Sequence, residues 1–372
     1  MRSPSTRAIS PDSSIRVMRD PWNDAELARR FTSQARTAMP RAPLNSALCA
    51  AVANDRSLHT LLGHAPTTRQ HPILLLAVIH FLLLAEPDQA LAGWYPNIAV
   101  DARNPLDPEL GATLADFVHE RSPAVLELLE TRRVQTNEVG RCALFLPPMT
   151  TVAAGVGPIA HVDVGSSAGL TLLMSHFAYR YNEGPTIGQS RVRLDCSTSG
   201  SGTVPDAIPP IASAQGVDID PIDITNPSDA RWLQACCWPD QTDRFRRLAN
   251  ALAIAHQNPP GVRSGDAVEL VGDLVEKAVH AGHPVVTTSW VMNYLDPSHR
   301  RRFIERLEEL GTEIDLSWVL AESPDQTPEL PHPADLAGKD ITALSLVTWR
   351  AGARQVQPLA TCHPHGYWLH WR

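Results

Sequence analysis

Apolar residues change their spacing once along the chain, and this change divides it into two regions. Over residues 24–154 they recur three and four positions apart, as in Leu110, Leu114 and Phe117, which is the spacing of amphipathic helices. Residues 71–84 are apolar almost throughout, which is typical of a helix that is buried on all sides. We therefore expect an all-helical N-terminal region.

After residue 158, short apolar runs alternate with helix-like segments. The predicted strands are residues 159–164, 215–219, 261–263, 284–289 and 314–321, and the predicted helices are residues 170–177, 230–237, 268–279 and 297–310. This alternation predicts a parallel sheet with crossover helices. Residues 341–350 and 366–371 are also strand-like but have no long helix between them, so we expect an antiparallel hairpin at the end of the sheet.

The expected fold class is α/β, with a mostly parallel, Rossmann-like sheet, a C-terminal antiparallel hairpin and an N-terminal all-helical domain. We divide the chain into a disordered tail (residues 1–20), which is rich in Ser, Pro and Arg, a helical domain (residues 21–155) and an α/β domain (residues 156–372). Residues 182–214 are rich in Gly, Ser and Pro and interrupt the alternation. We interpret them as an insertion in the α/β domain.

Composition narrows the classes of function. The net charge of −8 at pH 7 argues against binding to nucleic acid, because neutralising phosphates requires a basic surface. The N-terminus lacks the apolar core of a signal peptide, and the longest apolar run, residues 73–85, is too short to span a bilayer. We expect a cytoplasmic protein with no membrane or nucleic-acid partner, whose six cysteines stay reduced. We interpret Arg300, Arg301 and Arg302 as part of a solvated helix face.

The stretch with most chemical information is residues 159–173, IAHVDVGSSAGLTLL. It predicts a strand, a glycine turn at residues 165–169 and a helix, an arrangement that presents backbone N–H groups to a ligand. The turn does not match the G-x-G-x-x-G pattern of dinucleotide sites, because Ser167 and Leu170 stand at the second and third glycine positions. It also lacks the lysine of a P-loop.

The turn does match G-x-S-x-G, the nucleophile elbow of α/β-hydrolases, with Ser167 as the nucleophile. Asp315 or Asp325 and His363 or His365 would complete a triad in the required order. Against this interpretation, the carboxylate at the end of the preceding strand would lie beside the oxyanion that the reaction forms. The hydrolase stays as an alternative.

The same turn also matches D-x-G-x-x-x-G, the pattern of S-adenosylmethionine (SAM) sites at the first strand of an α/β domain. A nucleoside cofactor then requires a carboxylate for its ribose after the second strand and an acceptor for its adenine amine after the third. The expected cofactor-binding residues are Asp163, Gly165, Ser166, Ser167, Gly169, Asp218, Asp220, Asp266, Ala267, Ser289 and Trp290. Whether Asp218 or Asp220 holds the ribose stays open at this point.

Six longer segments carry a family resemblance: TRRVQTNEVGRCALFLP, VDVGSSAGL, GVDIDPIDIT, ARWLQACCWPDQ, GDAVEL and HPHGYWLHW. The chain from about residue 25 resembles a family of uncharacterised bacterial proteins, DUF2332, and residues 156–372 resemble the fold of class I SAM-dependent methyltransferases. The resemblance implies a methyltransferase-like sheet and a SAM site, and it implies no particular substrate. Ser167 departs from the methyltransferase pattern, because it replaces the middle glycine.

Methyl transfer requires the protein to align donor and acceptor, with a base only where the acceptor holds its proton tightly. The candidate catalytic residues are Glu322, Asn293, Tyr294 and Glu138, of which Glu322 is favoured as the base. A polar cluster precedes an apolar helix, and it either caps that helix or forms a wall of the site. The cluster consists of Gln135, Asn137, Glu138 and Arg141.

The histidines and cysteines predict no metal site. His161 lies inside the first predicted strand and is interpreted as a core residue. His363 and His365 have no third ligand in view, and the cysteines form no C-x-x-C pair.

The leading prediction is an enzyme that uses SAM to methylate a small molecule. One rival hypothesis keeps the methyltransferase fold without SAM and performs an intramolecular displacement, cyclisation or elimination, with Glu322 or Asp163 as the base. Two more hypotheses are the Ser167 hydrolase and a non-catalytic partner subunit. Assembly as a homo-oligomer or with a partner subunit stays open.

Overall fold

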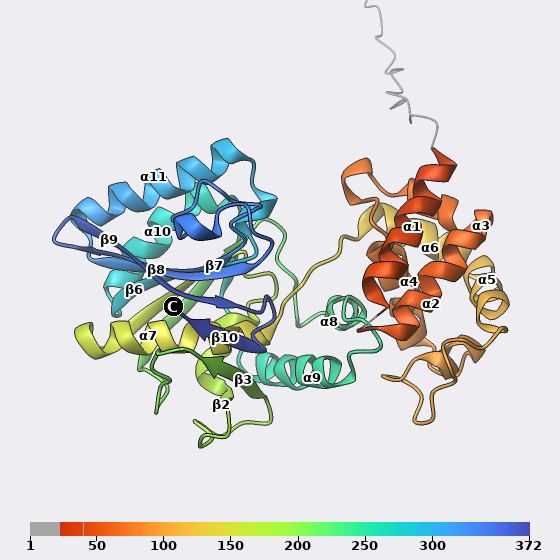
Figure 1. Ribbon diagram of the computed structural model, residues 1–372, viewed down its shortest axis with the longest axis horizontal. Helices are drawn as coiled ribbons and strands as arrows, with labels where there is room; N and C mark the ends of the chain where they lie inside the picture. The colour runs from red at the N-terminus through yellow and green to blue at the C-terminus, as the bar shows by residue number, and fades with distance from the viewer. Residues whose placement is uncertain (1–22, 40) are drawn as a thin grey trace, which may run out of the picture.

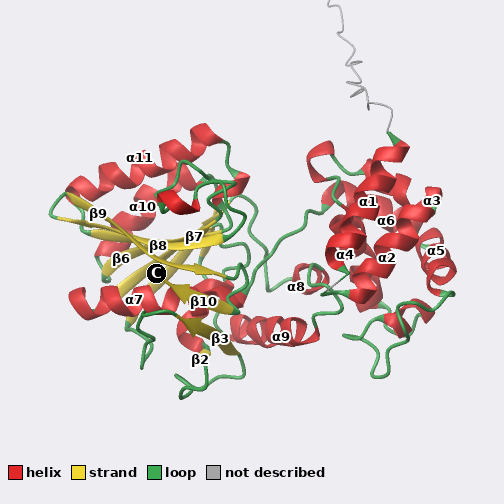
Figure 2. Cartoon of the chain, viewed as in Figure 1, coloured by secondary structure: helices red, strands yellow, loops and turns green. Residues whose placement is uncertain are grey.

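The computed structural model describes residues 23–39 and 41–372, so the predicted tail lies outside the described residues. The first part of the described chain is helical, as predicted (Figures 1 and 2). Its helices are α1 (Asp24–Ala38), α2 (Pro43–Asn54), α3 (Arg56–His59), α4 (Pro72–Ala85), α5 (Leu110–Glu120) and α6 (Ser122–Thr131), with short turns η1 (Thr60–His64), η2 (Thr67–Arg69) and η3 (Ala90–Trp94). Helix α4 begins at Pro72, whose fixed φ suits a first helical residue. It is the central helix of this part, since most of its side chains are buried.

The second part contains a ten-stranded sheet with the order β2-β3-β10-β9-β8-β7-β6-β1-β4-β5. The strands are β1 (Ile159–Val164), β2 (Ala178–Tyr181), β3 (Arg193–Ser199), β4 (Ile211–Asp218), β5 (Val262–Ser264), β6 (His283–Ser289), β7 (Leu316–Glu322), β8 (Thr342–Arg350), β9 (Ala353–Cys362) and β10 (Trp368–Trp371). The five strands predicted to be parallel are parallel, in the order β5-β4-β1-β6-β7. Strands β1 and β7 are buried along their whole length, which is why they read as continuous apolar runs. The chain is therefore a mixed α/β protein with a mostly parallel sheet.

The predicted C-terminal hairpin is wrong in its pairing. Strand β8 pairs with β9 rather than with β10, and β7, β8, β9 and β10 form an antiparallel meander. Strand β9 was not predicted because most of its residues are exposed, so it has no buried face to produce an apolar alternation. Strand β10 also pairs in parallel with β3.

The segment interpreted as an insertion, residues 182–214, extends the sheet. It contributes β3 and the start of β4, and β3 pairs in parallel with β2 at the edge of the sheet. The helix predicted at residues 170–177 is a 3₁₀ helix, η5 (Leu170–His176), which leads into β2. This first connection is therefore a short helix followed by an added pair of strands.

Helices cover both faces of the sheet (Figure 1). Helix α7 (Cys142–Val156), which follows the turn η4 (Val139–Arg141), lies on one face, and α10 (Ala267–Val279) and α11 (Pro297–Glu313) lie on the other. Residues 139–156 are long and apolar enough to cross a membrane by length and composition alone, but 67% of that window is buried inside the protein. In this structure the segment is a core helix of the α/β region.

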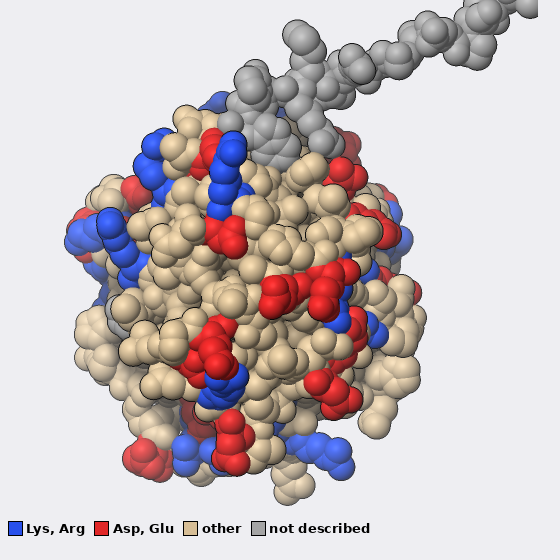
Figure 3. Space-filling view, turned by 90° about the vertical axis from the view of Figure 1, so that its right-hand side faces the viewer, with Lys and Arg blue, Asp and Glu red and all other residues tan. Residues whose placement is uncertain are grey.

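Helix α8 (Pro227–Ala235) joins the two regions, and α9 (Thr242–Gln257) follows it. Trp232 of α8 packs edge-to-face on Phe81 of α4 at 5.8 Å, and His80 Nδ1 lies 3.1 Å from the Ala235 carbonyl oxygen. Figure 1 accordingly shows α8 between the helical region and the sheet. Figure 3 shows the helical end of the molecule, where acidic side chains lie across the face. The basic side chains in this view lie between them and at the margins, and they form no continuous surface.

Candidate functional site

The predicted site lies at the carboxyl ends of the parallel strands. In the sheet, β4 and β5 lie on one side of β1, and β6 and β7 lie on the other. Ligands of open α/β sheets bind at such a topological switch point, outside the carboxyl ends of the strands. The glycine turn, residues 165–169, follows β1, and the loop of residues 290–295 follows β6. These two loops bound the candidate site.

Asp163 near the end of β1 is 5% exposed, and both of its carboxylate oxygens accept hydrogen bonds from threonine hydroxyls. Thr287 on β6 donates to Oδ1 at 2.5 Å, and Thr171 in η5 donates to Oδ2. His161 is buried, as predicted, and its Nε2 lies 2.8 Å from the Thr287 hydroxyl. Asp163 therefore links β1 to β6. The lone pairs that the two threonine hydroxyls do not use remain available to accept hydrogen bonds from a ligand.

The glycine turn is held in left-handed backbone conformations. Gly165, Ser167 and Gly169 have φ values of 74°, 52° and 71°. A β-carbon at Gly165 would lie 2.3 Å from Val291 Cγ2, and one at Gly169 would lie 2.7 Å from Pro260 Cβ. Glycine is required at both positions for the conformation and for the space.

Asp218 and Asp220 differ in what they contact. Asp218 at the end of β4 accepts the Ser167 N–H at 2.7 Å and the Asp220 N–H at 2.9 Å. Asp220 is exposed and forms an ion pair with Arg133 at 3.3 Å. The structure thus brings Asp218, and not the Asp220 carboxylate, to the glycine turn.

Asp266 lies after β5, the neighbour of β4. It caps α10 by accepting the Val268 N–H at 2.7 Å, and Ala267 is the first residue of that helix. Gly265 N–H donates to the Asp218 carbonyl at 2.9 Å, so the ends of β4 and β5 are tied together. Asp218 and Asp266 therefore follow adjacent strands at the same edge of the sheet.

The polar cluster of residues 135–141 crosses this edge and forms a wall of the site. Asn137 donates to the Ser166 carbonyl at 2.8 Å, and the Ser167 hydroxyl donates to the Gln135 amide oxygen. A cavity of about 10 Å³ beside Gln135 and Asn137 has room for a water molecule. The contacts of Gln135 and Asn137 support the interpretation as a wall, whereas Glu138 caps η4 by accepting the Gly140 N–H at 3.0 Å.

Glu138 is buried within a group of positive charges. Its carboxylate pairs with Arg244 Nε and with Arg247 Nη2 at 3.4 Å, and His365 Nδ1 lies 3.8 Å away. Burial alone would raise the pKa of Glu138, but the charges of Arg244, Arg247 and His365 outweigh it and lower the pKa to about 2. Glu138 is therefore an ionised group that joins η4 to α9, and both of its oxygens are engaged.

The loop after β6 carries several predicted site residues. Trp290 has a positive φ of 52°, and its indole N–H donates to the Thr342 hydroxyl at 3.0 Å. The Ser289 carbonyl accepts a hydrogen bond from Arg141 at 2.9 Å. Tyr294 is 79% exposed, so its side chain points to solvent, whereas Asn293 is partly buried.

Glu322 at the end of β7 is completely buried. Its Oε1 accepts the N–H groups of Val291 at 3.2 Å and Met292 at 3.4 Å, while Oε2 has no partner among the described residues. Burial raises the pKa of Glu322 to about 7, although the backbone N–H groups and the charge of Arg141 act in the opposite direction. This carboxyl group can both accept and give up a proton near neutral pH.

Other buried oxygens on segments of the candidate site also lack a partner within the described chain. They are Asn137 Oδ1, Ser289 Oγ, Asn293 Oδ1 and Ser323 Oγ. Buried polar atoms are normally hydrogen-bonded, so each exception calls for an explanation. A bound ligand or ordered water at this edge of the sheet would supply the missing partners.

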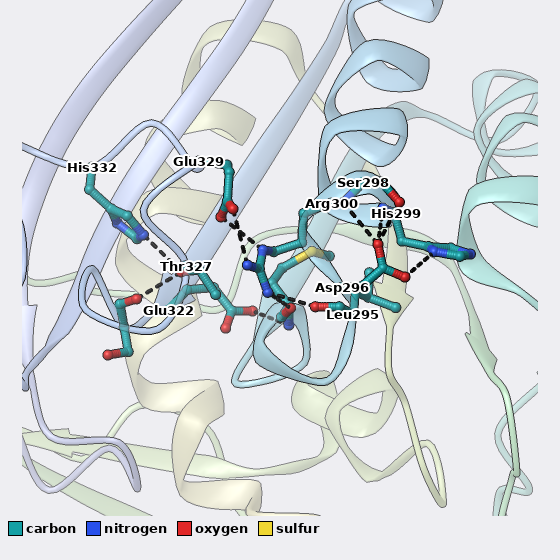
Figure 4. A network of polar contacts seen from close by, with 11 residues as sticks. Leu295, Asp296, Ser298, His299, Arg300, Glu322, Thr327, Glu329 and His332 are labelled. Atoms are coloured by element: carbon teal, nitrogen blue, oxygen red, sulfur yellow. Dashed lines mark hydrogen bonds and ion pairs between the residues drawn. The ribbon is translucent and has the colours of Figure 1, made fainter.

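A polar network fixes the two loops beside Glu322 (Figure 4). Arg300 donates to the Leu295 carbonyl at 2.6 Å and pairs with Glu329 at 2.9 Å. Thr327 bonds the Ser323 carbonyl at 2.7 Å and His332 Nε2 at 3.0 Å. The prediction of a solvated arginine face is therefore wrong for Arg300, which is 7% exposed, because its guanidinium is satisfied inside this network. Arg301 and Arg302 are exposed.

The residues proposed for a serine hydrolase are not assembled around Ser167. Within residues 23–39 and 41–372 no histidine ring contacts its hydroxyl, which donates to Gln135 instead. Asp315 directly precedes β7, at the amino end of that strand, and accepts a hydrogen bond from the Ala351 N–H. His363 stacks on Tyr367 at 4.6 Å. The described residues also contain no group of three or more His, Cys, Asp or Glu side chains suited to a metal ion.

Sequence reasoning missed the contacts that close the site. Thr287 and Val291 were not predicted to take part, and Arg141 was noted only within the polar cluster. The one available signal for Arg141 was a cation placed directly before an apolar helix, where burial is expected. No local pattern identifies the two other residues, because their partners are distant in sequence.

Comparison with known proteins identifies the family alone. The family model described as "Uncharacterized protein conserved in bacteria (DUF2332)" matches residues 28–371, which include both regions of the chain. No curated protein and no solved structure gives a match. The resemblance to this family is therefore confirmed.

Proposed function

The chain belongs to the DUF2332 family, and we propose that it is a cytoplasmic enzyme that transfers a methyl group from SAM to a small-molecule acceptor, with Glu322 as the base. Glu322 carries the proposal. It is a fully buried carboxyl group at the carboxyl edge of the sheet, its pKa is about 7, and Oε2 has no partner among the described residues. A base of this pKa suits an acceptor that must lose a proton at neutral pH.

The residues around the glycine turn fit the nucleoside half of SAM. Asp218 and Asp266 follow adjacent strands, and the lone pairs that remain on their carboxylates can accept hydrogen bonds from ribose hydroxyls and an adenine amine. Ser167, which replaces the usual middle glycine, already has the positive φ that a glycine would adopt. The Ser167 substitution therefore leaves the shape of the turn intact.

The methionine half of SAM fits on one condition. The backbone of Gly165 is where the cofactor would approach β1, and Val291 occupies the space above it. The Val291 side chain must turn away before an extended group can lie there. Asp163 would then face the amino end of the cofactor with the lone pairs that Thr171 and Thr287 leave unused.

When bound, SAM would supply an electrophilic methyl group. The chain's own residues then perform the remaining tasks. The N–H groups of Val291 and Met292 hold Oε1 of Glu322, and Oε2, which has no partner among the described residues, is left to take the proton of the acceptor. The loops after β6 and β7, fixed by Arg300 and Glu329, exclude water from this proton transfer.

Titration calorimetry with SAM and S-adenosylhomocysteine tests the proposal. We expect saturable binding of both to the wild-type protein and a loss of about tenfold or more in affinity in Asp218→Ala, because charge-assisted hydrogen bonds contribute about 1.5–3 kcal/mol. Asp220→Ala is the matched control, since the Asp220 carboxylate pairs with Arg133 on the surface. Equal affinities in the two variants, or no binding to the wild-type protein, would contradict the proposal.

A second candidate is a reaction at Glu322 that needs no SAM, such as an intramolecular displacement, cyclisation or elimination. The observation that favours it is the contact between Val291 and Gly165, together with the two threonine hydroxyls on Asp163. Calorimetry with Val291→Ala separates the candidates. Absence of SAM binding in this variant as well as in the wild-type protein, with Glu322 still titrating near pH 7 by NMR, would support the second candidate.

A further inference from the structure

Arg141 is a half-buried cation whose charge no carboxylate of the described chain neutralises by direct contact. Its Nε donates to the Pro364 carbonyl at 2.9 Å and its Nη1 donates to the Ser289 carbonyl at 2.9 Å. Two other arginines with little exposure are paired: the half-buried Arg244 with Glu138, and the buried Arg300 with Glu329. Arg141 forms no such pair within 4.0 Å among the described residues. Two carbonyl bonds hold the guanidinium in place but give it no carboxylate partner in direct contact.

The free side of this guanidinium is accessible. Nη2 has no hydrogen-bond partner among the described residues, yet it is not one of the unpartnered atoms that are sealed from solvent. A guanidinium has five N–H donors, so both hydrogens of Nη2 and the second hydrogen of Nη1 remain available. These donors form the edge of an arginine that binds a carboxylate through two parallel hydrogen bonds.

The bond to Ser289 places the Arg141 guanidinium beside the end of β6, at the candidate site. Arg141 is the last residue of η4 and directly precedes α7, and it donates to the carbonyl at the end of β6. Its charge acts on Glu322 and on Glu138. The oxygens without partners on Ser289 and Glu322 lie on the same two strand ends.

We propose that Arg141 is the receptor for a carboxylate group of the acceptor, and that the acceptor is a small organic acid. This inference rests on the proposed function only in calling the ligand an acceptor, since carboxylate binding itself does not require SAM. A single negative charge matches one free guanidinium edge. A dianionic phosphate would bring a second negative charge toward Glu138 and Glu322, which Arg141 does not neutralise by contact.

The proposal also assigns separate tasks to two groups of opposite character. Arg141 fixes one end of the organic acid, while Oε2 of Glu322 faces the atom that gains the methyl group or loses the proton. An acceptor without a carboxylate would cover the half-buried Arg141 and leave its free N–H groups without a hydrogen-bond acceptor, which is unfavourable. We therefore expect the site to bind organic acids in preference to their amides or esters.

Binding of benzoate, benzamide and inorganic phosphate to the full chain tests the inference, with and without SAM. We expect saturable binding of benzoate, by saturation-transfer NMR and by thermal stabilisation, and none of its neutral isostere benzamide. Arg141→Met should weaken benzoate binding by about 10- to 100-fold, because hydrogen bonds between two charged groups are lost. Arg350→Met is the matched control, since Arg350 also donates to backbone carbonyls but lies at the opposite edge of the sheet.

The results that would overturn the inference are distinct from failure of the methyltransferase proposal. If Arg141 has only a structural role, Arg141→Met will have a lower melting temperature but will bind benzoate as well as Arg350→Met does. Binding of phosphate with no binding of benzoate, or equal binding of benzoate and benzamide, would also overturn it. Arg141→Lys serves if the methionine variant does not fold, because it keeps the charge and loses the fork geometry, and its benzoate affinity is expected to fall. Failure of SAM binding alone leaves each of these results unchanged.

Discussion

Val291 lies directly over Gly165, so that a β-carbon on Gly165 would be 2.3 Å from Val291 Cγ2. This contact joins the loop after β6 to the turn after β1 at the switch point of the sheet. The Trp290 backbone, with its positive φ, and the bond from its indole to Thr342 hold the loop in this position. Access to the turn thus depends on one valine side chain.

Val291→Ala is expected to increase the affinity for SAM by about 3- to 10-fold. The substitution removes two methyl groups from the space above Gly165, so SAM no longer has to displace them when it binds. Moving one buried methylene-sized group into water costs about 1 kcal/mol. Calorimetry measures the change. Val356→Ala, on the exposed strand β9, is the control and should bind as the wild-type protein does. An unchanged or lower affinity in Val291→Ala would show that the valine does not obstruct the site.

Gly165→Ala is expected to lower the free energy of unfolding by about 2–4 kcal/mol. A left-handed conformation costs an alanine about 1–2 kcal/mol, and the clash with Val291 adds to it. Gly338→Ala separates the two contributions, because Gly338 has a φ of 67° and no atom lies within 4 Å of a β-carbon built there. Denaturant unfolding of both variants should show the larger loss at Gly165. Equal losses would mean that the contact with Val291 relaxes freely.

Much of this fold could be predicted because segments that are buried in the structure are apolar in the sequence. Strands β1 and β7 are buried throughout and read as continuous apolar runs, and the glycine turn was recognisable from its small residues. Strand β9 left no such trace, since Val356 and its neighbours are exposed. Its pairing with β8 is specified by the tight turn at residues 351–352, where Ala351 and Gly352 both have positive φ.

The candidate site was predictable only in part, for a different reason. The order of Asp163, Asp218 and Asp266 along the chain follows from the order of the strands. By contrast, the bond from Thr287 to Asp163 spans 124 residues, and no local pattern reveals it. The distinction between Asp218 and Asp220 likewise required the position of the Ser167 N–H group. Contacts between loops on different strands depend on the three-dimensional arrangement and not on spacing.

Glu138→Gln is expected to lower the free energy of unfolding by about 3 kcal/mol at pH 7. It leaves the half-buried Arg244 and Arg247 guanidinium groups without their carboxylate, and breaking a buried pair typically costs about 3–5 kcal/mol. Glu308→Gln is the control, because its pair with Arg354 at 3.5 Å is exposed and contributes little. Chemical denaturation measures both variants.

The contribution of Glu138 also has a definite pH dependence. Its pKa in the folded protein is lowered from 4.5 to about 2, so its stabilisation is fully present above the unfolded pKa. It is lost as the pH falls from about 4.5 toward 2. The difference in stability between the wild-type protein and Glu138→Gln should therefore shrink over that range. A difference that stays constant with pH would show that the carboxylate is not held by the arginines.

Glu322→Gln should behave in the opposite way with pH. The pKa of Glu322 is raised from 4.5 to about 7, so the folded state holds this proton more tightly than the unfolded state, and stability decreases as the pH rises from about 4.5 to 7. The difference between these two pKa values corresponds to roughly 3 kcal/mol. The neutral glutamine carries no such penalty, so Glu322→Gln should gain stability relative to the wild-type protein at pH 8 and show little gain at pH 4. Glu313→Gln, at the exposed end of α11, should follow the wild-type profile.

The same ionisation governs the proposed reaction, which allows two independent measurements to be compared. Only the ionised form of Glu322 can take a proton from the acceptor, so the rate should rise with pH and level off above an apparent pKa of about 7. Glu322→Gln keeps the acceptor of the Val291 and Met292 N–H groups but removes the base, and its rate should fall by about 10²- to 10⁴-fold. A rate profile with a midpoint near 7 that persists in Glu322→Gln would assign the base to another group, even where the stability measurement still reports the raised pKa of Glu322.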